Sequence, residues 1–195
     1  MTGIDDVTRI RTVEPHRIAE RLATRPKAPP WRDPDANMLI IAADHPARGA
    51  LAAGAVPDAM ADRSDLIARV STALARPGVH GFLGTADLVE ELALIGALDG
   101  KIVFGSMNRG GLAGSVFEAD DRFTGYDTRG IVEAGLDGGK MLLRIDPSDP
   151  ATVRTMEACA HAVDALAGAG RIAMVEPFLS ERAGGGLRNI LTPEA

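Results

Sequence analysis

The sequence has little cysteine and few aromatic residues. It contains one cysteine, and aromatic residues make up 4% of its 195 residues. A single cysteine excludes a disulfide within the chain. Cys159 lies among alanines in a helical pattern, EACAHAVDA, which predicts a small buried apolar side chain rather than a reactive thiol.

The chain also lacks a long apolar run, an excess of positive charge and a pattern of metal ligands. No run approaches the roughly 18 apolar residues that span a bilayer, and the acidic N-terminus MTGIDDVTRIRT is unlike a signal peptide. We therefore expect a cytoplasmic protein with no membrane partner. The formal net charge of -6 argues against a nucleic-acid partner. The histidines, at positions 16, 45, 80 and 161, share no ligand spacing, so no metal site is expected.

The remaining composition is that of an ordinary globular domain, with 46% hydrophobic and 25% charged residues. Near the N-terminus, residues 14–23 form one amphipathic segment. The stretch RPKAPPWRDPDAN follows it, and its prolines and charges disfavour regular structure. We predict an N-terminal helix and linker over residues 1–37 and a folded domain over residues 38–195.

From residue 38 onward, short apolar runs typical of buried parallel strands alternate with longer segments of helical period. Glycine and proline separate the segments, as in the DGG of residues 137–139. The predicted strands cover residues 38–44, 79–85, 101–107, 140–146 and 171–178, and the predicted helices cover residues 64–75, 87–98, 128–136 and 151–167.

Five β/α repeats fit either a doubly wound sheet or a TIM barrel. Polar residues at the carboxyl ends of the predicted strands favour the barrel, because barrel enzymes place their chemistry at this end. No glycine-rich G-x-G-x-x-G motif follows the first strand, which weakens the dinucleotide-binding form of the open sheet.

The predicted barrel is incomplete, because a full barrel takes roughly 250 residues and the fifth predicted strand ends at residue 178. The final segment ERAGGGLRNILTPEA has the form of a loop leading into a helix, with Thr192 as the N-cap and Pro193 at the first helical position. The predicted fold class is therefore α/β, an incomplete (β/α)8 TIM barrel with about five β/α units.

Lys140 is the most informative candidate for a catalytic residue, because it begins an otherwise apolar strand, KMLLRID. A buried lysine that loses its proton is an amine able to form a Schiff base or bind a substrate oxygen. The alternative is a lysine at the strand's amino end that extends to solvent. Asp44 and Glu176, near the ends of the first and fifth strands, are candidates for general acid and base, or for helix caps and surface ion pairs.

Substrate-binding candidates lie in three segments. Ser106, Asn108 and Arg109 belong to the glycine-rich GSMNRGGLAGS, whose amides suit a phosphate or carboxylate. His45 and Arg48, in DHPARG, are placed to orient a hydroxyl or bind an anion, whereas a lone histidine after a strand is more often a local hydrogen-bond partner. The third segment contributes Arg144, for which an ion pair with Asp146 is the alternative.

Three segments together resemble the class I aldolases of the DeoC/FbaB/LacD superfamily: AADHPARG, GLDGGKMLLRIDPSDP and MVEPF. The likeness extends from Met38 to the C-terminus and is greatest to LacD-type tagatose-bisphosphate aldolases and deoxyribose-phosphate-aldolase-like proteins. It implies a carbon–carbon lyase that acts on a sugar phosphate or related carbohydrate through a lysine imine, with no cofactor.

By the same resemblance, Asp44 contacts the reacting hydroxyl, Lys140 assists and Glu176 transfers a proton. The imine-forming lysine of such relatives lies on a sixth strand, which we do not find in this sequence. Three hypotheses follow. The chain is an aldolase fragment that is inactive alone, a barrel completed by a second copy in which Lys140 forms the imine, or a non-catalytic half-barrel that binds a partner. Whether it is an enzyme, and whether it is a homo-oligomer, stays open at this point.

Overall fold

The computed structural model describes residues 4–30, 37–108, 120–183 and 186–192. Its centre is one sheet with the strand order β1-β2-β3-β4-β5-β6, in which the first five strands are parallel and β6 is antiparallel to β5. The strands are β1 (Ile40–Ala43), β2 (Gly81–Gly84), β3 (Ile102–Ser106), β4 (Gly138–Ile145), β5 (Ile172–Ala183) and β6 (Gly186–Asn189).

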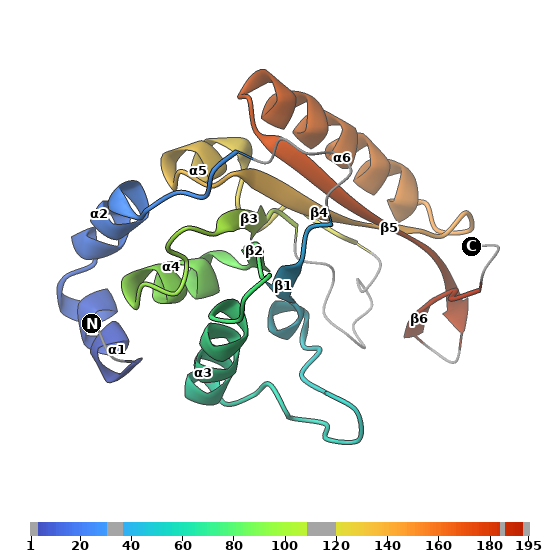
Figure 1. The fold of residues 1–195 in the computed structure, drawn as a ribbon. Coiled ribbons are helices and arrows are strands. Elements are labelled where there is room, and N and C mark those ends of the chain that lie inside the picture. The colour runs from blue at the N-terminus through green and yellow to red at the C-terminus, as the bar shows by residue number, and fades with distance from the viewer. Residues whose placement is uncertain (1–3, 31–36, 109–119, 184–185, 193–195) are drawn as a thin grey trace.

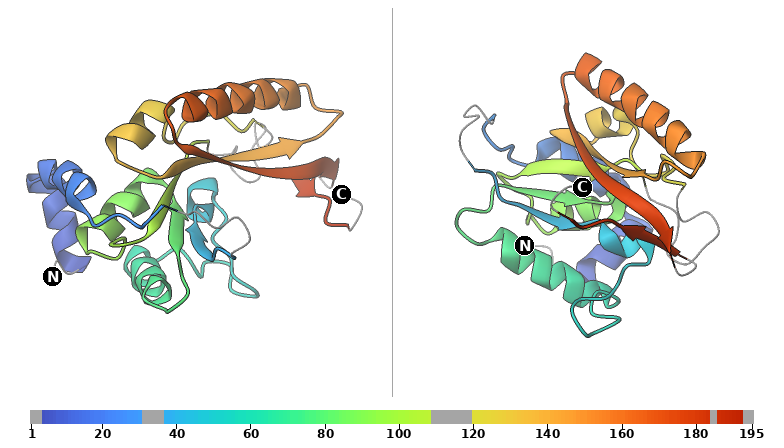
Figure 2. Two further views of the ribbon diagram at one scale, coloured as in Figure 1. Left: turned by 45° about the horizontal axis from the view of Figure 1, so that its top comes forward. Right: turned by 90° about the vertical axis from the view of Figure 1, so that its right-hand side faces the viewer.

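The sheet curls into a half-barrel, with the main helices along its outer side (Figure 1). These helices are α3 (Arg63–Leu74), α4 (Ala86–Leu94), α5 (Thr128–Glu133) and α6 (Ala151–Gly168). Because the strands follow one another in chain order with no reversal, the sheet is not doubly wound. The fold is thus a mixed α/β fold with a curled, six-stranded half-barrel sheet, as the two further views also show (Figure 2).

Two apolar clusters cover the two faces of this sheet. Since successive side chains of a strand point to opposite faces, Phe82 and Val103 pack under the helices, whereas Leu83 and Phe104 belong to a smaller cluster on the inner face. The cluster under the helices includes Cys159 of α6, as predicted, and burial raises the pKa of its thiol to about 11.

The same alternation places polar residues in a row on the inner face. In the register of the strands, Asp44, Thr85, Ser106 and Lys140 follow one another across β1 to β4, at the carboxyl ends of the first three strands. A parallel sheet therefore brings residues from distant parts of the sequence to one edge.

The predicted break at residues 137–139 is wrong in part, because Gly138 and Gly139 lie inside β4. A Cβ atom at Gly138 would collide with the carbonyl oxygen of Ile172, and one at Gly139 would collide with the sulfur of Met107. These glycines therefore allow close packing between neighbouring segments rather than a turn.

The two ends of the chain also differ from prediction. At the N-terminus we expected one helix, and the structure has two, α1 (Ile4–Val13) and α2 (His16–Thr24). At the other end, the expected loop after the fifth strand is wrong: β5 continues to Ala183 and pairs with β6. The predicted helix start at Pro193 lies outside the described residues.

No described helix combines the length and apolar character that a membrane crossing requires.

Candidate functional site

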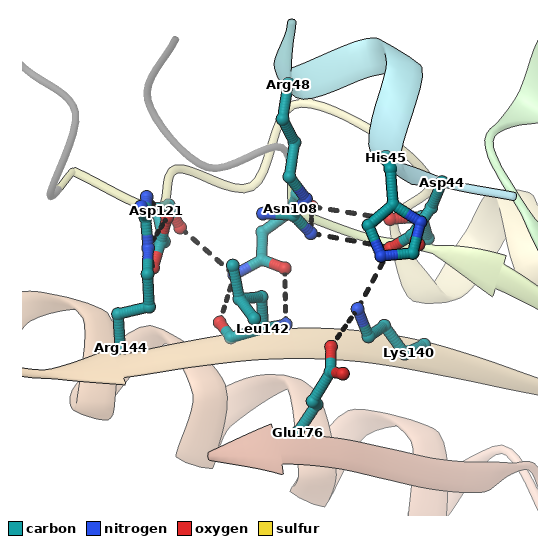
Figure 3. Close-up of polar contacts among 10 residues, drawn as sticks. Asp44, His45, Arg48, Asn108, Asp121, Lys140, Leu142, Arg144 and Glu176 are labelled. Carbon is teal, nitrogen blue, oxygen red and sulfur yellow. Dashed lines mark hydrogen bonds and ion pairs between the residues drawn. The ribbon is translucent and has the colours of Figure 1, made fainter. Parts of the chain in front are cut away.

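Lys140 is buried on the inner face of β4, where its side chain is 4% exposed. Its Nζ lies 2.9 Å from Oδ2 of Asp44 and 2.5 Å from Oε2 of Glu176 (Figure 3). The side chain is therefore bound between two carboxylates from β5 and the end of β1, and it does not extend to solvent. We call Asp44, Arg48, Lys140 and Glu176 the charged cluster.

Asp44 is the buried anion of the cluster, with 3% of its side chain exposed. Burial alone would raise the pKa of Asp44, but the charge and hydrogen bond of Lys140, together with the charge of Arg48, outweigh it. The pKa of Asp44 therefore lies below its ordinary value, and the carboxyl is ionised at neutral pH.

A short 3-10 helix, η1 (His45–Arg48), directs Arg48 back toward Asp44. Pro46 favours its first turn, and Gly49 ends it in the left-handed conformation, with φ of 76°. Arg48 Nη2 lies 3.5 Å from Asp44 Oδ2 and donates to the carbonyl of Asn108 at 3.4 Å. Among the described residues, the buried Arg48 Nη1 has no hydrogen-bond partner.

Glu176 and His45 form the open side of the site. The side chain of Glu176 is 44% exposed although its carboxylate binds the buried Lys140. His45 is 57% exposed, and its Nδ1 lies 3.7 Å from Oδ1 of Asp44. The cluster is thus closed around Asp44 and accessible at Glu176.

A second polar network lies beside the charged cluster and contains three of the remaining substrate-binding candidates. Asn108 is fully buried, and its amide binds the backbone of Leu142 on β4. Ser106 donates its hydroxyl to the carbonyl of Asn108 at 3.4 Å. Arg144 binds the buried Asp121, with its Nε 3.0 Å from Oδ2, so the suggested pair with Asp146 is not its contact here.

Sequence reasoning missed Asp121. It follows another aspartate in ADDRF, a pattern that looks like a solvated charge run, yet its side chain is 0% exposed. The only signal was Arg144 within an apolar strand, which needs an anion nearby, and the sequence offered Asp146 for that role. Arg109, the other candidate of this segment, lies outside the described residues.

Among the described residues, no group of three or more His, Cys, Asp or Glu side chains is arranged to hold a metal ion. The arrangement at Lys140 is one of charged hydrogen-bond partners, a type of arrangement that suits polar ligands and proton transfer.

Comparison with known families gives one family match. A family model described as Cgl0159-like matches residues 36–195, which include the whole charged cluster. No curated protein matches the chain.

Among solved structures, the chain is similar to the crystal structure of Cgl0159 from Corynebacterium glutamicum, with 49% sequence identity and a TM-score of 0.93. The match covers 98% of this chain and 64% of that chain. The present chain thus spans less than two thirds of the length of this relative.

These matches correct the resemblance to class I aldolases. The family that matches is Cgl0159-like rather than the DeoC/FbaB/LacD superfamily, and the structure is a mixed half-barrel sheet. The predicted aldolase activity, with its lyase and Schiff-base assignments, is wrong. The three segments that resemble aldolases did not identify the family correctly. A polar residue at the end of a parallel strand is common to many α/β sites and does not specify one reaction.

Proposed function

Because the chain belongs to the Cgl0159-like family, whose matched region contains the whole charged cluster, we propose a function for that cluster. It binds a small, hydroxyl-rich molecule of the carbohydrate class and exchanges protons with it. The observation that carries this proposal is the buried ammonium of Lys140 between the carboxylates of Asp44 and Glu176.

The hydrogen-bonding capacity of Lys140 supports a ligand at this place. An ammonium group has three N–H donors, and Asp44 and Glu176 account for two of them. The third suits a hydroxyl or carbonyl oxygen of a ligand. A fixed positive charge there stabilises negative charge that develops on that oxygen.

The two carboxylates suit different tasks because their surroundings differ. Asp44 is buried, and its lowered pKa keeps it an anion that holds Lys140 in place. Glu176 is half-exposed, so it exchanges protons with water and with a ligand that enters from the open side. Arg48 Nη1 and His45 then bind further ligand oxygens, and the roles of Ser106, Arg109 and Arg144 as binding residues stay predictions.

A finer description of the fold belongs to the same proposal: the half-barrel is the first part of a (β/α)8 barrel. The consecutive order of β1 to β5, their parallel pairing and the outer position of the helices support it. The relative from Corynebacterium glutamicum is longer, since this chain covers 64% of it. Further strands after β5 would then enclose the charged cluster at the carboxyl ends of the barrel strands.

Saturation-transfer NMR with a panel of pentoses, hexoses, polyols and their acids tests the binding proposal. We expect at least one compound to receive saturation from the wild-type chain and to lose most of it with Lys140→Met. Lys101→Met is the matched control, because the Lys101 side chain binds the carbonyl of Val79, at the opposite edge of the sheet. Equal binding by wild type and Lys140→Met, or binding by neither, contradicts the proposal.

A further inference from the structure

Asn108 extends the pairing between β3 and β4 beyond the point where the backbone of β3 leaves the sheet. The last backbone bond runs from Met107 N to Lys140 O, at 2.9 Å. Asn108 Oδ1 then accepts from Leu142 N at 2.8 Å, and its Nδ2 donates to Leu142 O at 2.6 Å. The side-chain amide thus replaces a peptide group and holds β4 two residues after Lys140.

The backbone carbonyl of Asn108 is connected to the other side of the charged cluster. It accepts from Arg48 Nη2 at 3.4 Å, and the same nitrogen lies 3.5 Å from Asp44 Oδ2. Asp44 in turn binds Lys140. Asn108 is therefore connected to both partners of the Asp44–Lys140 pair, through Leu142 of β4 on one side and through Arg48 on the other (Figure 3).

The side chain of Asn108 has no donor left for a ligand. Its residue is 0% exposed, and its two N–H groups are directed to Leu142 O and to Asp121 O, the latter at 3.2 Å. An aspartate of the same shape would lose both donors and would set a carboxylate against two carbonyl oxygens.

We propose that Asn108 is a positioning residue that fixes Lys140 against Asp44 and does not itself contact the ligand. This differs from the substrate-binding role expected from the sequence, and it rests on the function proposed above for the charged cluster.

NMR of the lysine side chains tests this proposal without any ligand. The chain has three lysines, at positions 27, 101 and 140, so the 15Nζ signals of a selectively labelled protein are few and are assigned by substitution. In Asn108→Asp we expect the Lys140 ammonium signal to shift and its hydrogens to exchange about five- to tenfold faster, as for the loss of one net hydrogen bond. The signals of Lys27 and Lys101 should stay in place.

Asn189→Asp is the matched control, because Asn189 is an exposed residue of β6 that binds Ser180. Asn108→Ser replaces the aspartate variant if the latter does not fold. Its hydroxyl provides one hydrogen-bonding group for the backbone of Leu142, so we expect a smaller shift of the Lys140 signal. An unmoved Lys140 signal in a folded Asn108 variant overturns the proposal and leaves Asn108 as a purely structural residue.

The two proposals fail in different ways. If no compound of the panel binds the wild type but the Lys140 signal responds to Asn108→Asp, the binding function is wrong and the positioning role stands. If compounds bind through Lys140 but the Lys140 signal does not change in Asn108→Asp, only the positioning role of Asn108 is wrong.

Discussion

The two edges of the parallel sheet use buried cations in different ways. At the amino edge, Arg25 is fully buried and donates to the carbonyls of Leu98, Lys101 and Gly135. The exposed Lys27 also donates to the carbonyl of Gly135, at 2.8 Å. At the carboxyl edge, the buried cations bind carboxylates: Lys140 binds Asp44 and Glu176, and Arg144 binds Asp121.

This difference suggests separate roles for the two edges. The buried cation of the amino edge stabilises the fold, and the cations of the carboxyl edge belong to the proposed binding site. Most partners of Arg25 are backbone carbonyls, which do not change their protonation state, and Asp137 is its one carboxylate partner among the described residues, at 3.5 Å. Arg25 thus mainly connects the segments before β3 and β4. The cations of the carboxyl edge are bound by side-chain carboxylates, which are groups able to take part in proton transfer. Burial lowers the pKa of Arg25, and the nearby Asp137 compensates only in part, which is consistent with a residue held for structure.

The largest expected effect on stability is at the amino edge. Arg25→Met removes a buried guanidinium that binds three backbone carbonyls and one carboxylate, and we expect a loss of about 3 kcal/mol in the free energy of unfolding. Urea denaturation measures it. Ligand binding by the folded protein should not change.

Arg69→Met is the control for this substitution, because Arg69 forms an exposed ion pair with Asp65 on α3, and it should cost less than about 1 kcal/mol. A loss of ligand binding in folded Arg25→Met would show that the amino edge also affects the binding site, which would contradict separate roles for the two edges.

Lys140→Met should destabilise the chain by about 2 to 3 kcal/mol, because it leaves the buried Asp44 with Arg48 as its remaining cation. The double variant Asp44→Leu with Lys140→Met should recover part of this loss, since a buried ion pair is replaceable by apolar side chains. Denaturation of both variants measures the difference. Equal stabilities of the single and double variants would contradict the buried pair.

The sequence predicted the backbone of the sheet better than the side-chain contacts of the site. The apolar runs predicted β1 to β4 within two residues, because apolar runs of this length suit buried parallel strands. They did not predict the β5–β6 hairpin, where the strand continues through a polar segment, SERA, that is stabilised by pairing with β6 and by contacts such as Arg182 with Asp149.

The position of Lys140 beside Asp44 could not be inferred from the predicted strands, which put Lys140 at the amino end of its strand. Because β4 begins at Gly138, its register sets Lys140 opposite Ser106 at the end of β3, and this brings it near Asp44. The contacts of Asn108 and Asp121 were not predictable either. An asparagine in a glycine-rich segment is typical of a loop, and only the three-dimensional structure shows that its amide takes the place of a strand residue. The family assignment failed for a related reason, because short polar motifs do not determine the protein that contains them.

The pH dependence of stability tests Asp44. A carboxyl whose pKa is lowered on folding contributes stability above its unfolded value, near 3.8, and loses it as the pH falls through the lower folded value. The wild type should therefore exceed Asp44→Asn in stability at neutral pH, and the gap should narrow in acid below about pH 4. Urea denaturation as a function of pH measures the gap, with the exposed Asp58→Asn as control. A gap that does not depend on pH would contradict the ion pair.

The smallest effect on stability is expected for Glu176→Gln. Its side chain is 44% exposed, so the loss of its ion pair should cost less than about 1 kcal/mol. Ligand binding should nevertheless weaken, because Glu176 orients Lys140 from the open side. Glu181→Gln, an exposed change on the same strand, is the matched control for denaturation and for saturation transfer. Unchanged binding by Glu176→Gln would exclude Glu176 from the site.

The most direct test of the account is a titration of the wild-type chain, labelled with 15N at the lysine side chains, with the compounds that show saturation transfer. We predict that the Lys140 signal shifts as a saturable function of ligand concentration while the Lys27 and Lys101 signals, at the amino edge, do not. Equal shifts of all three signals, or a shift confined to Lys27 and Lys101, would contradict a ligand site at the carboxyl edge.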